Sequence, residues 1–173
     1  GRGWYVAPGS SRCVARGAAG PVAAGRRAQF PRVELVGVFV DQGHDFVHAV
    51  AIALALEAVQ LHGNETIEDV VAAGADRFII KVLRVASKPP DFAAYAARCD
   101  AILLDTLVAH SAGGTGATFP WSIAAELRPK VARLILAGGR TSGNVSDAIR
   151  SVRRVAVDVC SGGESAPGRK QEA

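Results

Sequence analysis

The sequence contains no methionine, only three cysteines and few aromatic residues, which make up 6% of its 173 residues. Cys13, Cys99 and Cys160 are widely spaced and odd in number, so they indicate neither a disulfide framework nor a paired metal site. They predict a reducing, cytoplasmic setting. No apolar run reaches the roughly 18 residues that a membrane helix needs, and no secretory signal pattern is visible. We therefore expect no membrane partner.

Acidic residues are missing from the first 33 residues, which hold six arginines. The remaining residues include 14 basic and 16 acidic ones, so the rest of the chain is not basic despite a pI near 9.3. A nucleic-acid surface usually adds interleaved aromatic residues or a recognised motif, and neither accompanies these arginines. We expect no nucleic-acid partner. A basic RNA-binding module remains an alternative that depends on the arginines alone.

Short β-branched runs alternate with alanine-rich stretches along most of the chain. The runs are nearly continuous in apolar residues, which is typical of parallel strands covered on both faces. The expected strands are Trp4–Val6, Glu34–Val40, Ala58–Leu61, Phe78–Val82, Ala101–Leu104, Arg133–Leu136 and Val155–Val159. The expected helices are 46–54, 66–74, 90–98, 121–130 and 142–150, with one within 15–32 expected from topology alone. These units leave open a doubly wound sheet and a barrel of eight units.

Glycines cluster late in the sequence, each time after an expected strand. The clusters are Gly113–Gly116, Gly138–Gly139 and Ser161–Gly163. Glycine lets the backbone approach a ligand closely, and glycine-rich loops after the last two strands of a barrel recur as a phosphate site. Turns alone would explain one such pair, but three at successive strand ends favour an anionic ligand.

Three polar side chains lie at expected strand ends. Asp105 follows a run of buried-type residues, and a carboxylate there must be paired or functional because burying it alone is costly. For Asp158, between Val157 and Val159, a structural partnership with loop amides is an equally good interpretation. His62 follows the strand that ends at Leu61, and from the pattern alone a structural role is the better interpretation for it.

Several motifs occur together and in order over nearly the whole chain. They are GWYVAPGSSRCV (3–14), VGVFVD (36–41), AVQLHGNE (58–65), LLDT with GGTGATFPW (103–121), LILAGG with NVSDAI (134–149) and VDVCSGGESAPGRK (157–170). Together they resemble the phosphoribosylanthranilate isomerase family, and the pairing of QLHG with LLDT and GGTG is specific to it. The resemblance implies an α/β fold, a (β/α)8 TIM barrel. Residues 1–173 would form a single barrel domain holding strands 2 to 8.

The resemblance also implies the reaction and the residues that perform it. The family converts N-(5-phosphoribosyl)anthranilate to 1-(2-carboxyphenylamino)-1-deoxyribulose 5-phosphate by an Amadori rearrangement in tryptophan biosynthesis, without a metal or organic cofactor. An acid must protonate the ribose ring oxygen, and a base must then remove the proton on C2′. The family's residues fall here on Asp105 as the acid, on Arg12, His62 and Asp158 as substrate-binding residues, and on Gly138, Gly139, Ser161 and Gly162 as the phosphate site.

The general base has no counterpart in this chain. In the family it is a cysteine of the first strand, and none of the three cysteines matches that position. The missing methionine and the start at Gly1 lead us to expect that the first βα unit and the terminal helix are lacking. We expect the 173-residue chain to be inactive by itself. The alternative is a non-catalytic, decayed phosphate-binding barrel.

The resemblance leaves the partners and four substitutions open. The expected protein is a monomer or homodimer that acts on a phosphorylated small molecule, with fusion to or association with other tryptophan-pathway enzymes also open. Departures from the family pattern are Pro120, Arg140, Cys160 and Gly163. Pro120 is still compatible with the start of a helix.

Overall fold

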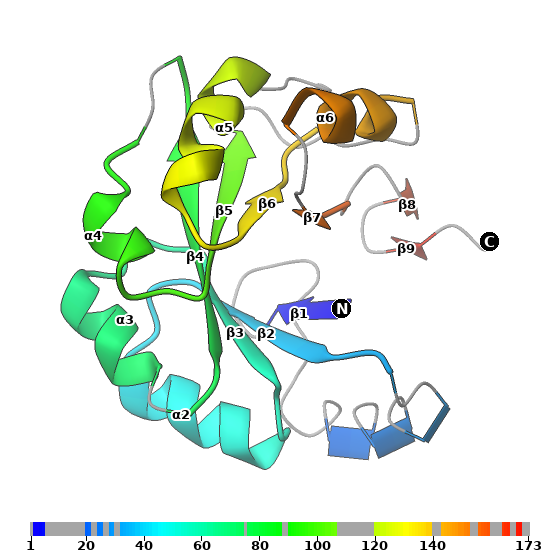
Figure 1. The fold of residues 1–173 in the computed structure, drawn as a ribbon. Helices are drawn as coiled ribbons and strands as arrows, with labels where there is room; N and C mark the ends of the chain where they lie inside the picture. Colours follow the sequence, from blue (N-terminus) through cyan, green and yellow to red (C-terminus); the bar gives the residue numbers. More distant parts are fainter. Residues whose placement is uncertain are drawn as a thin grey trace. The chain divides into compact units, whose positions relative to one another are not determined.

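The computed structural model describes part of the chain. The described residues are 2–5, 20–21, 24–25, 28–29, 32–74, 76–87, 90–106, 120–139, 143–152, 156–159, 164–166 and 169–170. The chain divides into two compact units, Gly1–Lys81 and Val82–Ala173, and each is described by itself (Figure 1).

The first unit is built on parallel strands that neighbour one another in chain order. These are β1 (Arg2–Tyr5), β2 (Leu35–Phe39), β3 (Ala58–Leu61) and the first half of β4 (Phe78–Val85). The helices α2 (His44–Ala53) and α3 (Ile67–Ala73) follow β2 and β3 and pack against each other. Each helix turns a short apolar face inward, and Phe39 and Val59 are fully buried in the strands. Burial of these faces drives the fold of the unit.

The second unit repeats the pattern. After the end of β4, its elements are α4 (Ala93–Ala96), β5 (Ala101–Thr106), α5 (Trp121–Leu127), the 3-10 helix η1 (Arg128–Lys130), β6 (Leu134–Leu136), α6 (Val145–Val152) and β7 (Ala156–Val157). The strands β5, β6 and β7 are parallel and adjacent in that order. Their side chains form one core with α5 and α6, in which Leu104, Leu127 and Leu136 are fully buried. In each unit, the strands are parallel and pair in chain order, as in half of a (β/α) barrel.

The sequence predicted most of these elements and missed two features. The expected strand Ala58–Leu61 is present with those bounds, and Pro120 immediately precedes α5. The expected helix 90–98 is wrong in length, because only Ala93–Ala96 is α-helical and the chain turns at residues 97 and 98. A short antiparallel pair, β8 (Glu164–Ala166) with β9 (Arg169–Lys170), was not expected, although Pro-Gly between them is a turn signal. Most of the helix expected within 15–32 lies outside the described residues.

The start of α3 is fixed by a capping box, a motif that Thr66-Ile67-Glu68-Asp69 already resembles in the sequence. Thr66 Oγ1 accepts a hydrogen bond from the Asp69 backbone N–H at 3.3 Å, and Asp69 Oδ2 accepts from the Thr66 N–H at 2.9 Å and from its hydroxyl at 3.1 Å. The backbone hydrogen bond and then the side-chain hydrogen bond from Thr66 hold the pKa of Asp69 below its ordinary value of 3.8. The carboxylate form is therefore favoured by folding.

This lowered pKa predicts a pH dependence of stability. The contribution of Asp69 is fully present above pH 3.8 and is lost as the pH falls through the lowered folded-state pKa. Between about pH 5 and about pH 3, the free energy of unfolding should therefore fall more for the wild type than for Asp69→Asn. Urea unfolding at both pH values measures this difference. Equal losses in the two proteins would contradict the assignment.

Candidate active site

Asp105 and Gly138 meet at the carboxyl ends of β5 and β6. Asp105 is half-buried near the end of β5, and its Oδ1 accepts a hydrogen bond from the Thr106 N–H at 2.9 Å. Gly138 lies just after β6, and its backbone is close to the end of β5. A Cβ on Gly138 would lie 2.6 Å from Asp105 Oδ1 and 2.6 Å from Thr106 N. The buried Thr106 hydroxyl beside them makes no hydrogen bond within the described part of the chain. A carboxyl group and a loop backbone without a side chain therefore lie in close contact.

The Gly138–Gly139 loop has a conformation that favours glycine. Both residues lie in the left-handed region, with φ of 74° and 64°. Hydrogen bonds hold the loop at both ends. The Ala137 N–H donates to Leu104 O at 2.8 Å, and Asn144 Nδ2 donates to Gly139 O at 2.8 Å. A fixed glycine backbone that precedes a helix, here α6, suits an anionic group. The sequence predicted the glycines but did not identify Asn144.

Replacing Gly138 by Ala should distort this loop. The methyl group would meet both a backbone nitrogen and the Asp105 carboxylate, and the left-handed φ adds strain. We expect Gly138→Ala to lower the free energy of unfolding by about 1–3 kcal/mol. Gly43→Ala is the matched control, since no atom lies within 4 Å of a Cβ at that position and its φ is −59°. Equal stabilities of the two variants in urea unfolding would count against the described loop.

Asp158 follows the neighbouring strand β7. Its N–H donates to Leu136 O at 2.8 Å, which places its backbone at the carboxyl end of β6, and the residue is exposed. The expected strand Val155–Val159 is thus shortened to Ala156–Val157, and Asp158 lies just beyond it. Asp105, Gly138 and Asp158 therefore lie at the carboxyl ends of three adjacent strands, at the same edge. Arg12, Ser161 and Gly162 lie outside the described residues, as do Arg140, Cys160 and Gly163.

In the first unit, His62 directly follows β3 and is partly exposed. Its N–H donates to Phe39 O at 2.8 Å, and its Nδ1 lies 3.1 Å from Gln60 Nε2. The amide nitrogen of Gln60 is a donor, so Nδ1 accepts and a neutral imidazole carries its hydrogen on Nε2. Such an N–H is suited to an oxygen acceptor of a ligand.

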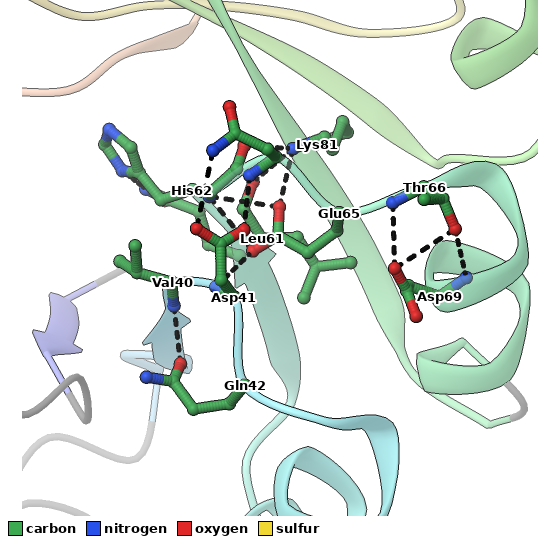
Figure 2. Close-up of polar contacts among 12 residues, drawn as sticks. Val40, Asp41, Gln42, Leu61, His62, Glu65, Thr66, Asp69 and Lys81 are labelled. Atoms are coloured by element: carbon green, nitrogen blue, oxygen red, sulfur yellow. Dashed lines mark hydrogen bonds and ion pairs between the residues drawn. The ribbon is translucent and has the colours of Figure 1, made fainter.

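Beside His62 lies a polar cluster that the sequence analysis missed (Figure 2). Its members are Asp41, Gly63, Asn64, Glu65 and Lys81, and we call it the lysine cluster. One signal was available, because Lys81 interrupts the apolar run of β4 and a buried charge must be paired. The identity of its partner was not available from the pattern, since pairing depends on the register of β3 and β4.

Two features are absent from the described residues. Among the described residues, no three His, Cys, Asp or Glu side chains gather as a metal ion would require. No helix in those same ranges is long and apolar enough to cross a membrane. What the geometry offers is a carboxyl group beside a backbone loop that suits an anion. This arrangement can perform proton transfer on a ligand held by a negatively charged group.

The comparisons with known proteins agree with this geometry. Residues 3–173 match the family model described as N-(5′phosphoribosyl)anthranilate (PRA) isomerase. A curated N-(5′-phosphoribosyl)anthranilate isomerase of Pelobacter propionicus is 41% identical over 140 residues, which are 81% of this chain and 66% of that protein. The corresponding protein of Thermotoga neapolitana is 39% identical over 140 residues, which are 81% of this chain and 68% of that protein.

Solved structures give the same result. The phosphoribosyl anthranilate isomerase of Thermotoga maritima superposes with a TM-score of 0.86 at 36% identity, covering 98% of this chain and 80% of that one. A phosphoribosyl anthranilate isomerase in complex with reduced 1-(o-carboxyphenylamino)-1-deoxyribulose 5-phosphate superposes with a TM-score of 0.81 at 33% identity, covering 98% and 79%. The chain therefore spans about two thirds of the curated relatives and four fifths of these structures.

Proposed function

Because the chain belongs to the N-(5′-phosphoribosyl)anthranilate isomerase family, we propose that it performs that family's reaction in tryptophan biosynthesis. The reaction is the Amadori rearrangement of N-(5-phosphoribosyl)anthranilate to 1-(2-carboxyphenylamino)-1-deoxyribulose 5-phosphate. The observation that carries the proposal is the contact of Asp105 with the Gly138 loop at the ends of β5 and β6. An acid and an anion site lie next to each other, as a phosphorylated sugar requires.

Asp105 is the proposed general acid. Its carboxyl group gives a proton to the ribose ring oxygen, the C1′–O bond breaks, and the anilino nitrogen lone pair forms the C=N bond of a Schiff base. Removal of the C2′ proton by a base then gives an enol, which becomes the ketone of the product. Gly138 and Gly139 would hold the phosphate together with Ser161 and Gly162. His62, Asp158 and Arg12 would contact the rest of the substrate, and a guanidinium such as that of Arg12 suits its carboxylate.

The finer architecture is also a proposal. We infer that β1 to β7 correspond to the second to eighth strands of a single eight-stranded barrel domain. The similar Thermotoga maritima chain, of which this chain covers 80%, supports the inference. That enzyme is described as dimeric, so a homodimer or a monomer is proposed here, in the cytoplasm.

Genetic complementation tests the function. The full-length product of the gene that encodes this sequence should restore growth without tryptophan to a bacterial strain that lacks the isomerase. The Asp105→Asn form of the same product is the control and should not restore growth. If the wild type is expressed and folded but growth fails, the non-catalytic alternative is the correct one.

We propose that the 173-residue chain has no isomerase activity by itself. None of its cysteines matches the family's first-strand base, so proton removal from C2′ has no catalyst. The fluorescence of phosphoribosylanthranilate should therefore decay with this chain at the rate of a buffer blank. Decay clearly above that blank would show that another group supplies the base.

A further inference from the structure

Lys81 and Glu65 form an ion pair that is almost fully removed from water. The Lys81 Nζ lies 2.6 Å from Glu65 Oε2, and the two side chains are 2% and 3% exposed. Removing two charges from water costs free energy that their attraction only partly returns, so a buried pair is weak evidence for stability. The presence of a buried ion pair at this position therefore needs a reason other than stability. The contacts that it makes with the backbone supply one.

The pair holds the turn between β3 and α3 from both sides (Figure 2). Glu65 accepts from the Gly63 N–H with both oxygens, at 2.9 and 3.0 Å. Lys81 Nζ donates to Gly63 O at 2.9 Å and to Leu61 O at 3.5 Å. Leu61 and Gly63 are the two neighbours of His62, so the backbone is fixed immediately before and after the histidine.

The same carboxylate also fixes the preceding turn. Glu65 Oε1 accepts from the Asp41 N–H at 3.0 Å, just beyond β2. Asp41 has a left-handed φ of 56°, which is uncommon outside glycine and persists only where its surroundings impose it. Its Oδ1 accepts from the Asn64 N–H at 2.5 Å, and a Cβ at Gly63 would lie 2.7 Å from Asp41 N. The two turns are thus in close contact, and a side chain at Gly63 would not fit between them.

We propose that the Lys81–Glu65 pair is a positioning pair, which fixes His62 at the carboxyl ends of β2 and β3 so that its imidazole meets the phosphoribosyl substrate. The inference depends on the proposed function of His62. The His62 N–H, bonded to Phe39 O, and its Nδ1, held by Gln60, complete the placement of the ring. Neither Lys81 nor Glu65 needs to touch the substrate. Hydrogen bonds weaken steeply when their geometry is disturbed, so displacement of the His62 ring after loss of the pair should weaken substrate binding.

The test uses the full-length gene product with Lys81→Met and with the double change Lys81→Met and Glu65→Met. The double variant leaves no unpaired buried charge, so it is expected to fold. Its KM for phosphoribosylanthranilate should rise about 10-fold or more while kcat stays within about twofold, because uniform binding is lost and the acid Asp105 is untouched. Lys130→Met is the matched control, since it removes an exposed pair with Glu126 at 3.0 Å. That variant should keep the wild-type KM.

A second readout separates this proposal from the proposed function. In ¹⁵N-labelled protein, the imidazole signals of His62 should shift or broaden in the double variant and stay unchanged in Lys130→Met. A folded double variant with wild-type KM and unchanged His62 signals would overturn the positioning role. A wild type that lacks isomerase activity would overturn the proposed function, and the His62 signals would then decide the positioning role alone.

Discussion

Replacing Asp105 by Asn in the full-length product is expected to lower kcat for phosphoribosylanthranilate about 100-fold to 10,000-fold. Asn has nearly the same shape and keeps an oxygen that accepts from the Thr106 N–H, so the loop contact with Gly138 should survive. What is lost is the proton for the ribose ring oxygen. The initial rate of fluorescence decay at saturating substrate measures the effect.

The matched control for this change is Asp147→Asn. Asp147 is exposed on α6, where it forms an ion pair with Arg150. It is the same residue type as Asp105 and lies in the same unit, but it is on a helix and not at the strand ends. We expect wild-type kcat from it. If Asp105→Asn also keeps wild-type kcat, the general acid is another group and the assignment of Asp105 is wrong.

Lys81→Met is expected to produce the largest loss of stability, about 3–5 kcal/mol in the free energy of unfolding. Methionine fills a similar volume, but Glu65 would be left as a buried carboxylate with its cation gone. Its remaining hydrogen bonds from Gly63 and Asp41 do not neutralise the charge. Urea unfolding of the wild type and the variant gives the difference.

The double change of Lys81 and Glu65 to Met tests the cause of that loss. If the unpaired charge is responsible, removing it as well should recover part of the stability, because the buried charge is gone. The rest of the loss should remain, because the Gly63 and Asp41 N–H groups lose their acceptor. Lys130→Met, at an exposed pair, should lose less than about 1 kcal/mol. A Lys81→Met variant as stable as Lys130→Met would contradict the buried environment.

Local sequence patterns predicted the structural features that depend only on residues close together in the sequence. The strand Ala58–Leu61 follows from a buried apolar run, and the α3 start follows from the Thr66–Asp69 box. The glycine pair at 138 and 139 was noticed from its place after an expected strand, and both residues have a positive φ, which glycine favours. Each of these features depends on a few neighbouring residues, so the sequence pattern was sufficient to locate it.

The lysine cluster could not be predicted because it depends on register. Leu61 and Lys81 are direct partners in the β3–β4 pairing, which places the ammonium group beside the turn that contains Gly63. A shift of one residue would turn Lys81 to the other face, and nothing in the local pattern specifies the register. The contact of Gly138 with Asp105 depends in the same way on how β5 and β6 align. Function was assigned to Asp105 from the resemblance, and the structure adds its neighbour.

The decay of phosphoribosylanthranilate fluorescence with purified, folded full-length product tests the central claim most directly. The account predicts enzyme-dependent decay that is saturable in substrate and that Asp105→Asn reduces at least about 100-fold. Decay at the rate of the buffer blank, from protein that unfolds cooperatively in urea, would contradict the claim that this protein is an isomerase.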